Sequence, residues 1–186
     1  KIHQSDDRTL ILRIFIRGRD LKLLVSARHS LPRLHLTDRS YPNPPSPLRF
    51  CAFLRSRITN ARIEGVAQPG FERIAVIELA KKDGEDIRKM RLVCELTGKS
   101  SNIILVDDNG IVLDALRFFG PESARPVVPG EKLGALPAAH GAKEEEPVSE
   151  EEGESWNSAA DRHYSALVEG DEFAREKAAL KKVINE

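Results

Sequence analysis

The sequence is poor in cysteine and in aromatic residues, and each scarcity excludes a class of protein. Its two cysteines, Cys51 and Cys94, form no CxxC pair, so neither a disulfide scaffold nor a structural zinc site is expected. Aromatic residues make up only 5% of the 186 residues, which disfavours an aromatic cage or a wide base-stacking platform. No apolar run approaches the roughly 20 residues that cross a bilayer. The chain starts at Lys1 without a signal-peptide pattern, so we expect a cytoplasmic fragment of a longer protein that contacts no membrane.

Catalytic motifs are also lacking. The five His residues are scattered, and the sequence contains no nucleophile elbow, no phosphate-cradling glycine-rich loop and no HExxH helix. His29 and His35 flank Pro32 in a basic stretch, where a hydrogen-bonded or surface role is favoured over metal binding or general-base catalysis. The residues themselves therefore nominate no catalytic group, no metal site and no cofactor.

A net charge of zero conceals a strong asymmetry along the chain. Residues 1–70 carry 13 Lys and Arg against 5 Asp and Glu, whereas residues 131–186 carry 7 against 14. A basic half followed by an acidic tail favours a polyanionic partner, although a solvated mixed surface explains the charges about equally well.

Alternating apolar residues from Arg8 onward predict a strand, and Leu21–Ser26 returns as its hairpin partner after a turn at Gly18. Spacings of three and four among apolar residues predict a helix over Pro47–Thr59, with Ser46 as its N-cap. Sequential hairpins with few helices indicate an α+β domain of mainly antiparallel sheets with one or two packed helices. Further strands are predicted at Arg33–Thr37, Arg62–Gln68, Arg73–Leu79, Arg91–Leu96, Asn102–Val106 and Ile111–Leu116.

The composition changes near Gly130. We expect a first domain over residues 1–134 and a flexible acidic linker over 135–154, since that segment is rich in Ala, Pro, Gly and Glu. Ser155–Val168 is predicted to be helical, with an interruption at Gly170. Apolar spacing after that glycine is typical of the start of a coiled coil, so 155–186 is predicted to be its first turns.

Seven motifs occur in a fixed order, and together they resemble the N-terminal domain of the NFACT family. That family includes bacterial proteins named fibronectin-binding proteins and acts in ribosome quality control. The motifs are KIHQ (1–4), LLVSARHSLPRLHLT (23–37), YPNPPSP (41–47), FCAFLRSRI (50–58), GFERI (70–74), GKSSNIILVD (98–107) and VVPGEKL (127–133).

The resemblance implies a fold similar to the N-terminal domain of formamidopyrimidine-DNA glycosylases, followed by a coiled coil. It also implies binding to tRNA, alanyl-tRNA by family resemblance, and to a stalled large ribosomal subunit, in support of messenger-free alanine tailing of nascent chains. The protein would bind and position these partners without cofactors, and the ribosome would perform the catalysis; no DNA partner is implied. By resemblance, Glu72 and Arg73 are the tRNA-binding pair. The donor-rich motifs add Arg28, His29, Arg33, Lys99 and Asn102 as candidate RNA contacts.

The chain departs from the family pattern in three places. It has Glu72-Arg73 where the family usually has Asp-Arg, and Thr97-Gly98-Lys99-Ser100-Ser101-Asn102 where the family has Met-Gly-Arg-His-Ser-Asn. The segment 135–154 is too short for the family's helix-hairpin-helix module. Two alternatives stay open at this point: a surface adhesin that binds fibronectin, and a nucleic-acid-processing enzyme of glycosylase-like fold.

Overall fold

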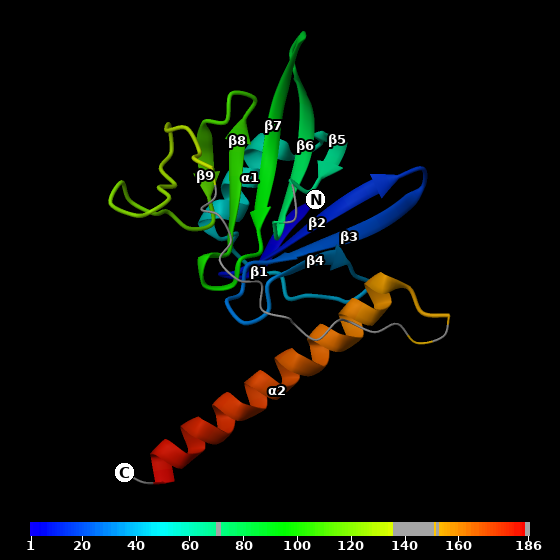
Figure 1. The fold of residues 1–186 in the computed structure, drawn as a ribbon. Coiled ribbons are helices and arrows are strands. Elements are labelled where there is room, and N and C mark those ends of the chain that lie inside the picture. Colours follow the sequence, from blue (N-terminus) through cyan, green and yellow to red (C-terminus); the bar gives the residue numbers. More distant parts are fainter. Residues whose placement is uncertain (70–71, 136–150, 152, 185–186) are drawn as a thin grey trace.

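The computed structural model describes residues 1–69, 72–135, 151 and 153–184, and for 171–184 it describes the backbone alone. Within these residues, nine strands form two antiparallel sheets and are accompanied by two α-helices (Figure 1). This arrangement confirms the predicted α+β class. The expected linker, 135–154, lies almost entirely outside the described residues.

The first sheet is built from the N-terminal quarter of the chain. Its register confirms the predicted hairpin, because Leu10 pairs with Val25 and Leu12 pairs with Leu23. Arg17 and Gly18 form the turn with φ values of 43° and 80°, the positive angles that suit a tight two-residue hairpin. The strands follow one another in chain order as β1 (Ile2–Asp6), β2 (Thr9–Ile16), β3 (Arg19–Ser26) and β4 (Arg33–Leu36).

The second sheet contains five strands, again in chain order. Its central hairpin is longer than predicted, because the charged segments around Gly84 continue the ladder as far as the pair Asp83 and Asp86. Charged side chains on both faces of this ribbon hide the alternation that marks a strand. The strands are β5 (Arg62–Ala67), β6 (Ile74–Asp83), β7 (Asp86–Glu95), β8 (Asn102–Asp107) and β9 (Val112–Ala115), with a single 3-10 turn at Gly98–Ser100.

The main core combines side chains from both sheets and from helix α1 (Arg49–Ile58). Helix α1 buries Cys51, Leu54 and Ile58, as its predicted apolar stripe requires, together with Phe50. The helix begins two residues later than predicted, and Leu48 rather than Ser46 is its N-cap. Pro47 keeps the residue before it extended, and the extended run continues through Leu48 before the helix starts.

Helix α2 (Trp156–Ile184) extends from the first sheet away from the rest of the molecule (Figure 1). The predicted helix is confirmed, but the predicted interruption at Gly170 is wrong, because the helix continues through it. A glycine in a helix interior costs about 1 kcal/mol, which a helix of this length tolerates. The side chains expected at coiled-coil positions, such as Leu180, lie outside the described side chains.

Candidate functional site

The turn that carries Glu72 and Arg73 lies where β6 begins. The Gln68 Nε2 atom donates a hydrogen bond of 2.9 Å to the Glu72 carbonyl oxygen, which ties the turn to the end of β5. The Leu96 backbone N–H donates to the Arg73 carbonyl at 2.8 Å, so the turn is also fixed to the residue that follows β7. Arg73 is exposed and Glu72 is half-buried. The sheet therefore holds this turn by its backbone and leaves the arginine facing outward.

A second group of loops approaches the same end of the second sheet. Lys99 is exposed in the 3-10 turn, and its carbonyl accepts a 2.9 Å hydrogen bond from the Arg117 guanidinium. A side-chain carbon placed on Gly98 would lie 3.8 Å from the backbone oxygen of His29, so the loop after β3 packs against this turn. The structure thus brings exposed His29 and Lys99 together from two different sheets.

Arg28 lies in that loop but is bound to a carboxylate. Its Nη2 atom donates to Asp6 Oδ2 at 2.8 Å, and the Arg8 backbone N–H donates to the other Asp6 oxygen at 2.8 Å. Burial alone would raise the pKa of Asp6, but the hydrogen bonds from Arg28 and Arg8 prevail and lower it. The positive charge of Arg28 is therefore largely compensated, so it is less available to a polyanion than that of Lys99.

Arg33 and Asn102, two of the candidate RNA contacts, have side chains that are largely buried. Arg33 is 8% exposed, and its guanidinium lies 4.9 Å from the centre of the Tyr164 ring. Asn102 is fully buried, and its amide exchanges two hydrogen bonds of 2.9 Å and 3.0 Å with the Arg117 backbone. Asn102 therefore fixes the backbone at Arg117, and Arg33 packs against Tyr164 of α2.

Helix α2 is fixed to β4 by a polar cluster that sequence reasoning missed. Asp161 accepts hydrogen bonds from Thr37 Oγ1 at 2.7 Å and lies 2.9 Å from Nε2 of His35. Asn157 Oδ1 accepts the backbone N–H of Leu36 at 2.8 Å. Burial lowers the pKa of His35, and the hydrogen bond with Asp161 only partly offsets that effect. No local pattern predicts this cluster, because its two halves are more than 100 residues apart.

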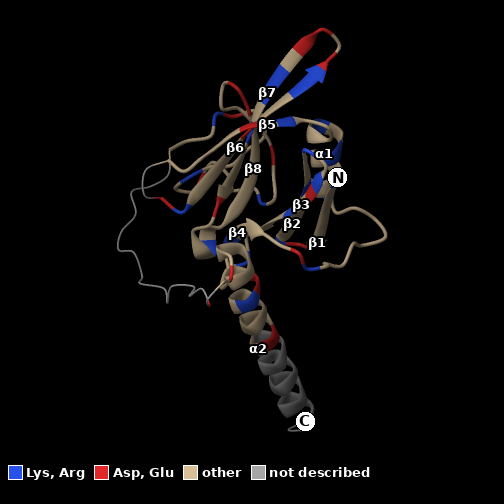
Figure 2. Ribbon diagram, turned by 90° about the vertical axis from the view of Figure 1, so that its right-hand side faces the viewer, with Lys and Arg blue, Asp and Glu red and all other residues tan. Residues whose placement is uncertain are grey.

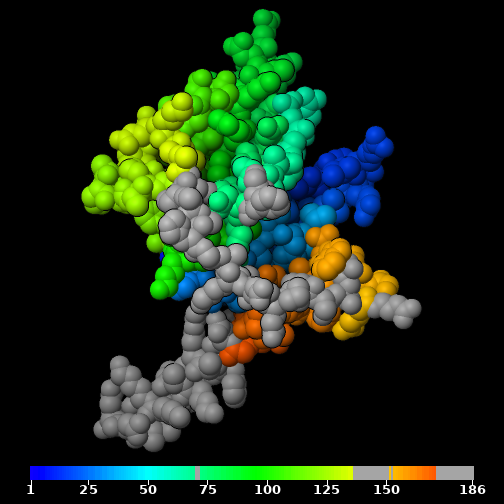
Figure 3. All heavy atoms as spheres, in the orientation of Figure 1, coloured from blue at the N-terminus to red at the C-terminus, as the bar shows by residue number. Residues whose placement is uncertain are grey.

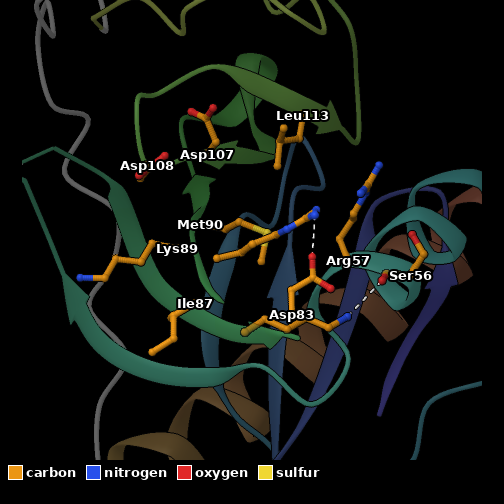
Figure 4. A pocket seen from close by; sticks show the side chains of 11 residues that line it. Ser56, Arg57, Asp83, Ile87, Lys89, Met90, Asp107, Asp108 and Leu113 are labelled. Atoms are coloured by element: carbon orange, nitrogen blue, oxygen red, sulfur yellow. Dashed lines mark hydrogen bonds and ion pairs between the residues drawn. The ribbon is translucent and has the colours of Figure 1, made fainter. Parts of the chain in front are cut away.

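A hollow of about 570 Å³ lies between the end of α1 and the β6–β7 hairpin (Figure 4). The charges that line it are mixed. Arg88 pairs with Asp83 at 2.5 Å, and Lys81 donates to the carbonyl of Ser56 at 3.1 Å. Lys and Arg line the stem of this hairpin and carboxylates line its tip, as Figure 2 shows. Because the lining mixes charges of both signs, the hollow assigns no ligand by itself.

The described residues offer few groups for metal binding or nucleophilic chemistry. No group of three His, Cys, Asp or Glu side chains there could hold a metal ion. Cys51 and Cys94 are free thiols and are buried, as expected, and burial raises the pKa of Cys94 to about 12. No helix in the described part of the chain is long and apolar enough to cross a membrane.

The fold and the charged loops define a two-sheet α+β domain that leads into an extended helix. The family model described as NFACT N-terminal and middle domains matches residues 1–169. The chain therefore belongs to the NFACT family, which confirms the resemblance seen in its motifs.

Two curated relatives carry the name Rqc2 homolog RqcH. The protein from Bacillus subtilis (strain 168) is 37% identical over 144 residues, which cover 74% of this chain and 25% of that protein. The protein from Streptococcus suis is 33% identical over 145 residues, which cover 75% of this chain and 26% of that protein. The chain thus spans about a quarter of the length of these relatives.

Solved structures show the same fold. The N-terminal part of the fibronectin/fibrinogen-binding protein from Streptococcus suis superposes with a TM-score of 0.71 at 33% identity, covering 75% of this chain and 54% of that one. The N-terminal domain of the fibronectin-binding protein PavA from Streptococcus pneumoniae gives a TM-score of 0.70 at 26% identity, covering 100% of this chain and 76% of that one.

Proposed function

We propose that this chain is the RNA-binding part of a ribosome quality-control factor. It binds tRNA and the stalled large ribosomal subunit, and it supports messenger-free alanine tailing of nascent chains. The observation that carries the proposal is the family match over residues 1–169, together with relatives named as Rqc2 homologues. Because the chain spans a quarter of those relatives, it supplies binding surfaces for a larger protein.

The proposed tRNA contact is made by the turn that carries Glu72 and Arg73. An exposed arginine offers a planar fork that fits a phosphate or a base edge, and a neighbouring carboxylate orients that fork or accepts from a ribose hydroxyl or base amino group. Lys99 and His29 add exposed polar groups from the neighbouring loops. Glutamate reaches one methylene further than the aspartate of the family pattern.

The proposal assigns binding and positioning to the protein and peptide-bond formation to the ribosome, without a cofactor. It places the protein in the cytoplasm, where ribosomes work. Helix α2 is proposed to begin the family's coiled coil, and the two-sheet body to share its fold with the N-terminal domain of formamidopyrimidine-DNA glycosylases. Neither assignment implies glycosylase chemistry, since a shared fold does not carry a reaction.

Binding measurements at two salt concentrations test the proposal. The 186-residue chain is titrated with tRNA and with isolated large ribosomal subunits at low and at physiological salt. Because Lys and Arg release condensed counterions from phosphates, the affinity is expected to fall steeply with salt, about tenfold or more when several contacts form. The proposal is contradicted if the chain binds neither tRNA nor large subunits at low salt, or if its affinity does not change with salt.

Fibronectin binding is a second candidate function, favoured by the names of the solved relatives. The same preparation is measured against immobilised fibronectin, with serum albumin as the reference surface. Specific binding to fibronectin without RNA binding would favour the adhesin alternative.

A further inference from the structure

One face of the β2–β3 hairpin combines exposed cations with an exposed aromatic ring. Side chains alternate along a strand, so Arg13 and Phe15 point to the same side of β2. Phe15 is 75% exposed, although it lies near the tip of a regular hairpin whose register is complete. In Figure 3 this tip projects from the body on the right-hand side. A large ring kept in water at a projecting tip is available to a partner.

A hollow of about 310 Å³ lies on the same face, and its lining includes Asp20, which pairs with Phe15 across the hairpin. Arg13 pairs with Asp20 across the hairpin, and Lys22 donates to the backbone carbonyls of Asp38 and Arg39 at 2.7 and 2.6 Å. Those carbonyls are neutral, so the charge of Lys22 is not cancelled there, and Arg39 adds another exposed cation. The hollow is lined by His3, Ile11, Arg13, Asp20, Lys22, Arg39, Ser40 and Tyr41.

The surroundings of His3 indicate a positive potential in this hollow. Burial lowers the pKa of His3, and nearby cations, with Arg55 foremost and Arg13 and Lys22 among them, lower it further. The cations that disfavour a proton on this imidazole would favour an anion beside them. One carboxylate, that of Asp20, faces three cationic side chains in the lining.

We propose that this face of the β2–β3 hairpin binds single-stranded RNA, with a phosphate in the hollow and a neighbouring base stacked on Phe15. The proposal rests on the RNA-binding function and adds a second contact surface to the Glu72–Arg73 turn. Arg13 and Phe15 are two residues apart, about 7 Å along the strand, so one RNA strand reaches both. Every base has a π-face that stacks on an aromatic ring, whereas an uncharged apolar partner would desolvate the cations without pairing them.

The stacking part is tested with Phe15→Ala and two fluorescent probes. One probe is a short single-stranded RNA oligonucleotide, and the other is the same sugar-phosphate chain without bases. The variant is expected to bind the RNA about 5- to 20-fold more weakly and the abasic chain as tightly as the unmodified protein does. Val66→Ala is the matched control, because Val66 is an equally exposed apolar residue, 65% exposed, on the other sheet.

The phosphate part is tested with Arg39→Gln. This change is expected to weaken binding to both probes. It is also expected to reduce the slope of log affinity against log salt by about 0.7, the value for one phosphate contact on a single strand. Arg88→Gln is the control, since Arg88 is an exposed, paired arginine on the other projecting hairpin. Equal unfolding midpoints for all variants show that the changes act on binding.

The possible outcomes separate failure of the inference about the hairpin from failure of the proposed function. If the unmodified chain binds RNA but Phe15→Ala has no effect, or weakens both probes equally, this inference fails and the proposed function stands. If Phe15→Ala reduces binding to vesicles of anionic lipid and not to RNA, the face binds membranes and the inference is wrong. If the unmodified chain binds tRNA or large subunits but neither probe, the inference fails and the proposed function stands. If it binds none of these at low salt, both fail.

Discussion

The Nε2 atom of His35 lies 2.9 Å from Oδ1 of Asp161, and this contact joins edge strand β4 to helix α2. The same carboxylate accepts a hydrogen bond from Thr37 Oγ1, so one side chain makes several contacts with β4 and the residue after it. The direction in which α2 leaves the domain therefore depends on Asp161. In the proposed ribosome quality-control role, that direction would set how the two-sheet body and the helix are presented together.

Replacing Asp161 with Ala is expected to loosen the attachment of α2. Hydrogen bonds to a charged group contribute about 1.5–3 kcal/mol, so backbone amides at the contact should exchange about 10- to 150-fold faster. Hydrogen exchange at Leu36 and Asp38 measures the effect, because their N–H groups donate to side chains of α2. Arg162→Ala, at an exposed neighbouring position, is the control. Unchanged exchange would show that Asp161 does not hold the helix.

The same contact predicts a pH dependence of stability. Burial lowers the pKa of His35, and Arg33 lowers it too, against the opposing effect of Asp161. The folded state thus favours neutral imidazole, and below the ordinary pKa of about 6.5 the unfolded state binds more protons. The stability that neutral His35 contributes is therefore present above about pH 6.5 and is lost as the pH falls below it.

Denaturant unfolding from about pH 7.5 to about pH 5 measures this loss in the unmodified protein and in His35→Gln. The variant should lose less stability over that interval. His3 also has a lowered pKa, so its contribution remains in both proteins, and only the difference between the two curves reports on His35. Parallel curves would contradict the prediction.

Asn102→Ala is expected to destabilise the protein by about 1–3 kcal/mol, since the Arg117 backbone groups that bond the amide would lose their partners. Urea unfolding measures the change, and Ser100→Ala in the exposed turn nearby is the control. Full stability combined with weaker RNA binding would instead indicate that Asn102 contacts RNA directly.

Local patterns predicted most of the fold. Alternation along β2 and β3, and the apolar stripe of α1, were sufficient because each pattern reports burial against a single core. The extension of β6 and β7 was missed because Lys81, Lys82, Arg88 and Lys89 lie in strands whose end projects beyond that core, where burial imposes no alternation.

The candidate site was harder to predict from residue types. Asn102 and Lys99 lie in the same donor-rich motif and were predicted together as RNA contacts. Asn102 is buried and Lys99 is exposed, a difference that only the tertiary structure reveals. Phe15 received no role from the sequence, since an aromatic residue in an alternating strand usually packs inward. The contact between His35 and Asp161 joins segments that are far apart in the sequence, so no periodic pattern predicts it.

The decisive residue for the proposed function is Arg73. Arg73→Ala is expected to weaken tRNA binding about 5- to 150-fold, corresponding to about 1–3 kcal/mol for one charge-assisted contact, and to leave the unfolding midpoint nearly unchanged because the side chain is exposed. Filter binding with tRNA measures the affinity. Arg62→Ala, which removes another exposed arginine, on neighbouring β5, is the control for nonspecific loss of charge.

Glu72→Asp refines this test, because it restores the family's carboxylate at a shorter reach and should keep tRNA binding within a few-fold if the carboxylate only orients the arginine. If Arg73→Ala unfolds the domain, the arginine is structural and the site assignment is wrong. If Arg73→Ala and Arg62→Ala weaken binding equally, the turn contributes only general positive charge. A loss confined to Arg73→Ala, with large-subunit binding intact, separates tRNA recruitment from ribosome attachment and assigns the first to this turn.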